Sequence, residues 1–299
     1  MTLVQILLLA ALILPASAHA VSDELYPCGT ITTSIRLKRD CLAPMSIARD
    51  DITVDLNGHT VHGVAALRSG SIDVVDRRGV TIKNGNIKSS LILDDRLGLN
   101  VLFGGGHTIR DLNVYNLAVR IREVDHVDVK RVAVTTSQSF PLASNSSFNF
   151  VGAYSKISQV VSQGTLSAGA VIAGEALVVA DNEFRSEKLC GLAFPTERST
   201  LRGNMLITAA ADTRLGGLCA AGYNALIKGN TILGVATGLI LPSTADGFVI
   251  RNNYIRSDPA AAPDAVDIRA GINACTNTWK RNNFETDSEG DGPDSGCIQ

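Results

Sequence analysis

Charged and polar side chains gather between residues 94 and 131, which makes this stretch the richest part of the chain for chemistry. Arg120 and Arg122 alternate with apolar residues, so we expect their side chains to share one face of a strand. Two guanidinium groups beside Asp125 and His126 have the chemistry to bind a sugar carboxylate or sulfate and to accept a proton. The candidate substrate-binding residues are Arg120, Arg122, Asp125, His126, Asp94 and Asp95.

Three interpretations of this stretch remain open. Its charges can pair across neighbouring elements on a solvated face, they can bind a ligand without turnover, or they can form a catalytic site. Elsewhere, His59 and His62 are three residues apart on a strand and turn, which places them on opposite faces and argues against a metal site. Gly104 to Gly106 lack the Lys-Ser/Thr of a phosphate-binding loop. We therefore expect no metal and no cofactor.

The composition excludes several classes of protein. The chain has 299 residues, of which 45% are hydrophobic and 19% charged, so it has enough apolar material for a large core. Its 27 basic residues face 29 acidic ones, which argues against electrostatic capture of nucleic acid. After the N-terminus no apolar run is long enough to span a membrane. Aromatic residues make up only 5%, so we expect an interior of aliphatic side chains with little room for rings.

The N-terminus and the cysteines both indicate export. Residues 3–14 form an apolar run that Pro15 ends, and Ala18-His19-Ala20 offers small residues for signal peptidase, so residues 1–20 are predicted to be a signal peptide. An even number of cysteines without a CxxC pair fits disulfides in an oxidising compartment. The six are Cys28, Cys41, Cys190, Cys219, Cys275 and Cys297. Pairing nearest neighbours is the simplest arrangement, although six cysteines permit other connectivities.

A repeat covers the mature chain. A short apolar strand, a polar pair and a second apolar residue recur every 20 to 29 residues. The repeat anchors, which are the central apolar residues, are Ile82, Ile109, Val129, Ile157, Val179, Leu201, Ile227, Ile250 and Trp279. A second strand precedes each anchor by about ten residues, and no helical period lies between them. These features predict a coil in which each repeat forms one turn and strands stack in parallel.

Asparagine occupies the third position after each of the last five anchors. These residues are Asn182, Asn204, Asn230, Asn253 and Asn282. Asn tolerates the left-handed backbone region that tight bends need, so we expect it to form the bends. Stacked Asn side chains can also hydrogen-bond to one another along the coil axis.

The Asn-marked repeat resembles that of the secreted right-handed parallel β-helix proteins, the pectin-lyase-like superfamily. The opening CGTITTSIRLKRDC and the closing CTNTWKRNNFETDSEGDGPDSGC strengthen the resemblance. It implies an all-β, right-handed parallel β-helix of about nine to ten turns over residues 51–284. Residues 21–50 would form an N-terminal cap and residues 285–299 a C-terminal cap or tail.

Enzymes of that superfamily place acidic and basic side chains on an exposed ladder halfway along the coil. Here the predicted outward ladder is Arg120, Asn149, Val171, Ala193, Cys219, Ile240 and Asp267. Its middle is uncharged, whereas a hydrolase needs two carboxylates and a lyase needs a base with a charge-neutralising partner. The NTD motif of polygalacturonases and the DPHE motif of alginate epimerases are absent.

The sequence therefore favours a secreted, periplasmic or cell-surface β-helix that interacts with an acidic polysaccharide without an evident catalytic centre. A polysaccharide lyase, hydrolase or epimerase is the alternative. A structural or adhesive repeat protein is the third reading, because Val171, Ala193 and Ile240 would form a flat apolar face for self-association.

Overall fold

A computed structural model describes residues 28–63, 70–89, 97–136, 146–262, 264–271, 274–288 and 297–298. The predicted signal peptide lies outside these residues, and the proposed domain boundaries remain predictions. Within the described residues no helix is long and apolar enough to cross a membrane.

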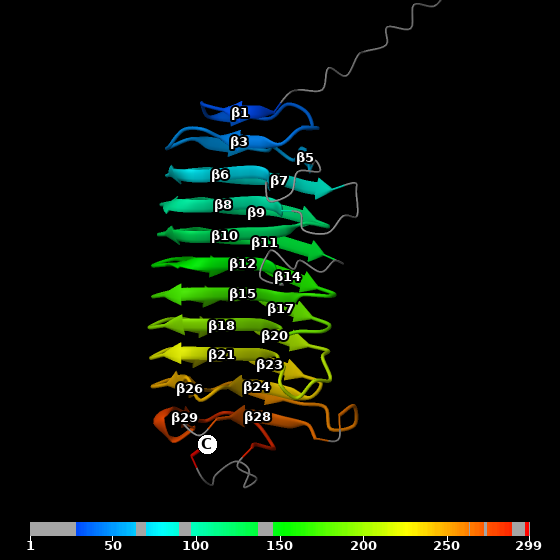
Figure 1. The fold of residues 1–299 in the computed structure, drawn as a ribbon, viewed down its shortest axis with the longest axis vertical. Coiled ribbons are helices and arrows are strands. Elements are labelled where there is room, and N and C mark those ends of the chain that lie inside the picture. The colour runs from blue at the N-terminus through cyan, green and yellow to red at the C-terminus, as the bar shows by residue number, and fades with distance from the viewer. Residues whose placement is uncertain are drawn as a thin grey trace, which may run out of the picture.

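The predicted parallel β-helix is confirmed, with strands stacked in one column from end to end of the molecule (Figure 1). About eight complete turns form it, a minor difference from the nine to ten expected. Short strands continue the stack at both ends.

One sheet is a single parallel ladder. In spatial order its strands are β1 (Gly29–Ile31), β3 (Met45–Ile47), β6 (Gly70–Arg78), β8 (Leu97–Gly105), β10 (Ala118–Asp125), β12 (Ser146–Ala153), β15 (Ala168–Glu175), β18 (Leu192–Glu197), β21 (Leu218–Tyr223), β24 (Thr237–Leu241) and β28 (Val266–Ala270). The short strand β25 (Ala245–Asp246) also pairs with β21.

The remaining strands form the rest of the coil wall. They are β2 (Ile35–Arg36), β4 (Thr53–Asp55), β5 (Thr60–Gly63), β7 (Thr81–Ser89), β9 (Thr108–Tyr115), β11 (Asp128–Thr136), β13 (Lys156–Ser158), β14 (Val161–Gly164), β16 (Val178–Ala180), β17 (Glu183–Ser186), β19 (Thr200–Arg202), β20 (Met205–Thr208), β22 (Leu226–Lys228), β23 (Thr231–Gly234), β26 (Val249–Arg251), β27 (Tyr254–Arg256) and β29 (Thr278–Lys280). A 3-10 turn, η1 (Ala274–Thr276), precedes β29.

Every repeat anchor predicted from the sequence pairs with the next one. The register joins Ile82 to Ile109, Ile109 to Val129, and continues without a shift to Trp279. All nine anchors are buried, so the period-two pattern of the sequence correctly marks the inward side chains.

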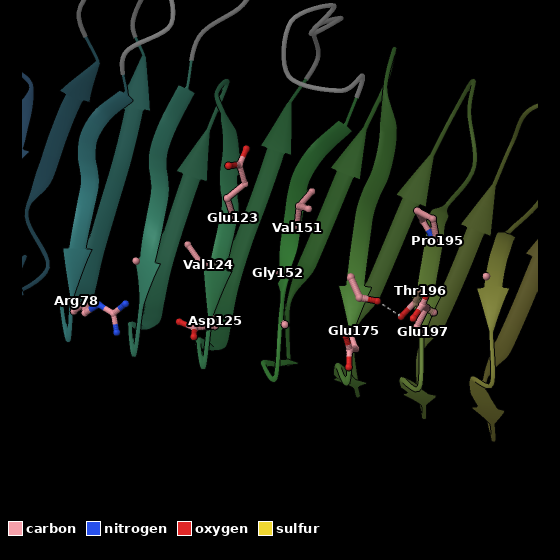
Figure 2. A pocket seen from close by; sticks show the side chains of 14 residues that line it. Arg78, Glu123, Val124, Asp125, Val151, Gly152, Glu175, Pro195, Thr196 and Glu197 are labelled. Carbon is pink, nitrogen blue, oxygen red and sulfur yellow. Dashed lines mark hydrogen bonds between the residues drawn. The ribbon is translucent and has the colours of Figure 1, made fainter.

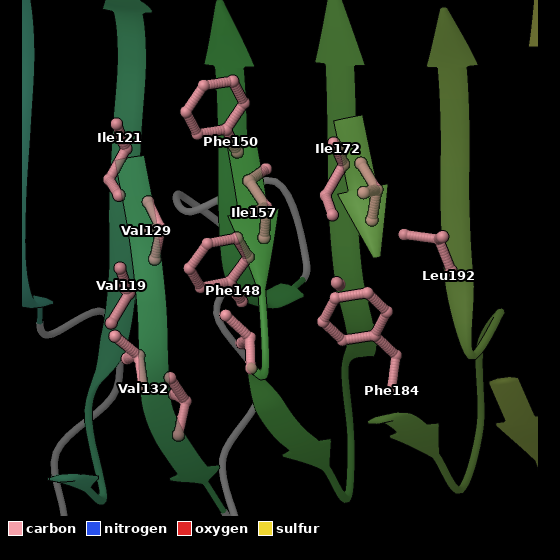
Figure 3. Close-up of a cluster of buried hydrophobic side chains, with 14 of the residues drawn as sticks. Val119, Ile121, Val129, Val132, Phe148, Phe150, Ile157, Ile172, Phe184 and Leu192 are labelled. Atoms are coloured by element: carbon pink, nitrogen blue, oxygen red, sulfur yellow. The ribbon is translucent and has the colours of Figure 1, made fainter. Parts of the chain in front are cut away.

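The interior holds more rings than we expected. Phe148, Phe150 and Phe184 are fully buried, together with Phe194 and Phe248. Phe148 and Phe184 stack with ring centroids 6.5 Å apart, between aliphatic side chains of neighbouring turns (Figure 3). Few aromatics in the composition therefore did not mean few in the core, because most phenylalanines lie inside.

The five repeat asparagines form a hydrogen-bonded column, and all but the last, Asn282, are buried. Each amide group donates to the next amide oxygen, from Asn182 to Asn204 at 2.9 Å through to Asn253 and Asn282 at 3.0 Å. The expectation that these residues adopt the left-handed conformation is wrong. The preceding residue does so, for example Asp181 with φ 58° or Asn252 with φ 54°, which turns the Asn side chain inward.

The three disulfides join nearest neighbours. Cys28 bonds to Cys41 and Cys275 to Cys297, with Cα atoms 5.7 and 4.9 Å apart, near the two ends of the column. Cys190 bonds to Cys219 across neighbouring turns, with a Cα separation of 6.1 Å.

Candidate functional site

The predicted charge cluster separates into different environments. Arg120 lies half-buried on β10 and donates to the Asn100 amide oxygen at 2.9 Å, while the Asn100 amide group donates to Asp73 at 2.7 Å. Burial, followed by the nearby charge of Arg122, lowers the pKa of Arg120. Arg120 is thus engaged in a polar ladder along the wall. Asp94 and Asp95 lie outside the described residues.

Asp125 and His126 lie at the end of β10, where the chain bends. The Asp125 carboxylate is 3.4 Å from His126 Nδ1. The His126 ring is exposed and stacks on Tyr154, with centroids 5.4 Å apart. Of the predicted substrate-binding residues that the structure describes, only Asp125 lines the large groove described next.

An open groove of about 840 Å³ crosses the ends of these strands. Its lining comes from seven successive strands of the single ladder, β6 to β21, so the groove follows the coil axis (Figure 2). The lining residues are Arg78, Gly104, Glu123, Val124, Asp125, Val151, Gly152, Ala153, Gly174, Glu175, Pro195, Thr196, Glu197 and Gly222.

Glycines form the floor of the groove. Gly152, Gly174 and Gly222 belong to one register line with Val124 and Thr196. Gly174 has a φ of 134°, and a Cβ there would lie 1.7 Å from the Gly152 carbonyl oxygen. Because the backbones pack this closely, no side chain can rise from these positions, which leaves the channel open.

One edge of the groove is a second register line, which we call the edge ladder. Its members are Arg78, Gly105, Asp125, Ala153, Glu175, Glu197, Tyr223 and Asp246. Neighbouring strands lie about 4.8 Å apart, so the acidic groups recur at multiples of that spacing. Figure 2 shows Asp125, Glu175 and Glu197 along this edge and Glu123 nearer the opposite one.

The edge carboxylates have different partners. Glu175 forms an ion pair with Arg198, which follows the edge ladder after β18. The floor residue Thr196, next to Glu197, donates its hydroxyl to the Gly174 carbonyl at 2.9 Å and is thereby held in place. Asp125 occupies space that Gly105 leaves free, since a Cβ on Gly105 would lie 1.8 Å from Asp125 Oδ1.

Three exposed aromatic residues are next in sequence to residues of the groove lining. They are Phe103, Tyr154 and Tyr223, which are 45%, 56% and 49% exposed. Phe103 has a φ of 61°, a conformation that is rare for a bulky residue. Exposed rings beside a polar channel are suitable for stacking on the apolar faces of sugars.

The sequence reasoning missed Glu175 and Glu197, and it misplaced the end of the outward ladder. Ile240 pairs with Arg269, whereas Asp267 is buried and accepts hydrogen bonds from Ser257 and Glu285 backbone N–H groups. A signal for the edge ladder was present, because each member lies four residues before a repeat anchor, as Glu175 does before Val179.

His59 and His62 do not point apart as predicted. Both side chains face Asp40 of the preceding turn, with His59 Nδ1 at 3.2 Å and His62 Nε2 at 3.8 Å from its carboxylate. The pKa of Asp40 is lowered mainly because its carboxylate accepts a hydrogen bond from the Thr60 backbone N–H. In the described part of the chain no group of three His, Cys, Asp or Glu residues could hold a metal ion.

No protein-family model and no curated protein matches this chain in sequence. Solved structures of other proteins match its fold, among them the following two. The A-module of mannuronan C-5 epimerase AlgE4 from Azotobacter vinelandii has a TM-score of 0.53 and 11% identity, covering 85% of this chain and 86% of that one. DFA-IIIase from Arthrobacter chlorophenolicus A6, in complex with GF2, has a TM-score of 0.51 and 12% identity, covering 83% and 85%. The likeness is one of fold.

Proposed function

We propose that this protein is an exported polysaccharide-binding β-helix, in which a glycan chain lies lengthwise in the groove. The observation that carries the proposal is the groove itself, which follows the coil axis over seven strands. At about 4.8 Å per strand that is a length of roughly 29 Å, long enough for several sugar residues. Three disulfides support export, because such bonds persist in oxidising compartments.

The chemistry of the lining also fits a glycan. Carboxylates can accept hydrogen bonds from sugar hydroxyls, and exposed rings can stack on sugar faces. The AlgE4 module, which shares the fold, is by name part of an epimerase of the polysaccharide mannuronan.

Hydrolysis of the bound glycan is the second candidate function. Asp125 and Glu175 belong to the edge ladder with Ala153 between them, which separates their backbones by about 9.6 Å. Inverting glycosidases hold their two carboxyl groups roughly 6.5–9.5 Å apart, with room for a water molecule, so Asp125 and Glu175 would reach this range with their side chains inclined toward each other. A lyase would also need a charge-neutralising partner, and Arg78 is the one basic residue among the groove's lining residues.

The apolar face proposed for self-association remains a prediction. Val171, Ala193 and Ile240 do share one register line, and each is half-buried. Sedimentation at high protein concentration tests this prediction, since a protein that stays monomeric throughout would contradict a contact between two molecules along this face.

A blocked groove tests the proposed function. Ala153→Trp places a large ring in the channel, and Ala133→Trp places the same ring on β11, outside the groove lining, as the matched control. We expect Ala153→Trp to abolish retention on immobilised glycans and Ala133→Trp to retain it. Equal retention by both variants, or no retention by the unmodified protein on neutral, acidic or amino glycans, would refute the proposal.

The same panel tests turnover. New reducing ends without unsaturated products indicate hydrolysis, and unsaturated products with ultraviolet absorbance indicate a lyase. If hydrolysis occurs, Asp125→Asn and Glu175→Gln should each abolish it while both variants still bind the glycan. Unchanged rates in both variants would exclude this pair as the catalytic carboxylates.

A further inference from the structure

We infer that the groove selects a glycan that carries free amino groups. This inference rests on the proposed function, because it assumes that a glycan occupies the groove. The inference adds the chemical class of the sugar, and the charges of the groove lining support that choice.

The lining is strongly unbalanced in charge. Four of its residues are acidic, Glu123, Asp125, Glu175 and Glu197, and one is basic, Arg78. Arg198 compensates Glu175 from outside the lining, and no salt bridge joins Arg78 to Asp125 among the described residues. The channel therefore has an excess of negative charge at neutral pH.

The positions of the carboxylates suit a polymer with a repeated positive charge. Glu175 and Glu197 are on adjacent strands, about 4.8 Å apart, and Asp125 is two strands from Glu175. This spacing is similar to the advance of one sugar residue along an extended chain. Successive ammonium groups could then each lie near a carboxylate, whereas the carboxylates of a uronate polymer would be repelled along the whole channel.

The aromatic flank provides a second contact for the same ligand. Tyr223 follows Glu197 on the edge ladder, and Tyr154 follows Ala153 in the chain. Both residues are about half exposed, and His126 stacks on one face of the Tyr154 ring, so the Tyr223 ring and the opposite face of Tyr154 are the surfaces that a ligand can contact. An aromatic face attracts a cation as well as an apolar sugar face, so an ammonium-bearing sugar would satisfy carboxylate and ring together.

The experiment compares three size-matched oligosaccharide series by calorimetry on the secreted protein: glucosamine oligomers, N-acetylglucosamine oligomers and galacturonate oligomers. We expect the glucosamine series to bind at least tenfold more tightly than the N-acetylated series, and the uronate series to bind least. The preference should fall at high salt, since ions screen exposed charges.

Variants assign the effect to the groove. Glu123→Gln and Glu197→Gln should each weaken glucosamine binding by roughly two- to fivefold, the effect of one exposed charge pair, and should weaken N-acetylglucosamine binding less, because the Gln amide oxygen still accepts hydrogen bonds from sugar hydroxyls. Glu187→Gln is the matched control, because Glu187 is exposed and does not line the groove.

The outcomes separate the two ideas. Equal affinity for amino and N-acetylated oligomers, or tighter binding of uronates, would overturn the charge inference and leave the groove as a glycan site. Binding of none of the three series would refute the proposed function itself. Glucosamine binding that Glu187→Gln weakens as much as Glu197→Gln does would also overturn the inference, because attraction would then be a property of the whole surface.

Discussion

Asn230 is the middle of the asparagine column, and its removal should be costly. Its amide oxygen accepts the Asn204 backbone N–H and the Asn204 side-chain amide, both at 2.9 Å. Its amide group donates to the Leu201 carbonyl and to Asn253 Oδ1, both at 3.0 Å. The side chain is buried, with 2% exposure of the residue, so water cannot replace these bonds.

The cost follows from the hydrogen bonds that are lost. In Asn230→Ala, the Asn204 side-chain amide keeps its bonds to Val179 and Arg202 carbonyls. The Asn204 backbone N–H loses its acceptor, and the Leu201 carbonyl, which belongs to the ladder of β19 and β22, loses one hydrogen bond. An unsatisfied buried group costs about 1–3 kcal/mol and a lost hydrogen bond about 1 kcal/mol, so we expect a loss of about 3 kcal/mol in the free energy of unfolding.

Urea unfolding followed by circular dichroism measures the loss, and hydrogen exchange of residues 199–208 locates it. Asn252→Gly is the matched control, because Asn252 is exposed, has a φ of 54° that glycine adopts freely, and precedes the column residue Asn253. A loss in Asn230→Ala below about 1 kcal/mol, or one equal to that of Asn252→Gly, would refute the view that the column stabilises the coil.

Three further perturbations have definite expected results. His107 is buried, its Nδ1 accepts the Val80 backbone N–H at 3.3 Å, and burial lowers its pKa. Protonation therefore favours the unfolded chain, and the free energy of unfolding should fall as the pH drops below about 6.5. His107→Ser should remove this dependence in urea titrations at several pH values, while the Ser hydroxyl keeps the contact with Val80, as Ser155 does with the Val127 backbone N–H at 2.9 Å. Gly105→Ala should displace Asp125, whose carboxylate and backbone carbonyl oxygens would lie 1.8 and 2.5 Å from the added methyl group, and so weaken glycan binding in calorimetry. Gly106→Asn should not, because Asn tolerates the φ of 67° at that position and a Cβ there meets nothing closer than 3.7 Å. Replacing Cys190 and Cys219 by serine opens a link of 29 residues and should lower stability by about 3.5 kcal/mol in urea, and an unchanged midpoint would show that the bond contributes nothing.

The fold was predictable because its signal is repeated. Each turn alternates inward and outward side chains, so errors at one repeat are corrected by the others, and the anchors from Ile82 to Trp279 fall in register. The disulfide between Cys190 and Cys219 was predictable for the same reason, because residues about one turn apart in sequence are adjacent in space.

The candidate site was not predictable by counting along the strand. The register shifts between Arg122 and Val124, where Glu123 has a φ of 57°, and Phe103 has a φ of 61° in the turn before. A bulge of this kind adds a residue and changes which face the following side chains occupy. Strict alternation of inward and outward side chains, counted forward from Arg120, therefore gives the wrong direction before it reaches Asp125. Counting four residues back from each repeat anchor gives the members of the edge ladder correctly.

Contacts between successive turns of the coil were the second feature that the sequence did not predict. His59 and His62 were placed on opposite faces by alternation, yet Asp40 of the preceding coil lies within 3.8 Å of both rings. The spacing of two residues within one strand gives no information about a side chain contributed by another turn.

The asparagine column and the groove occupy the same turns, which has a consequence for binding. Asn182 and Asn204 lie in the turns that carry Glu175 and Glu197, and the column fixes the distance between those turns from inside. The glycine floor removes side chains that could close over a ligand, so within the described residues the carboxylates are positioned by the backbone of the coil. A site built on rigid strands loses little conformational entropy when a ligand binds, and its selectivity depends on whether the ligand's charges match a fixed spacing. That is why the choice between amino, neutral and acidic glycans is the most informative measurement on this groove.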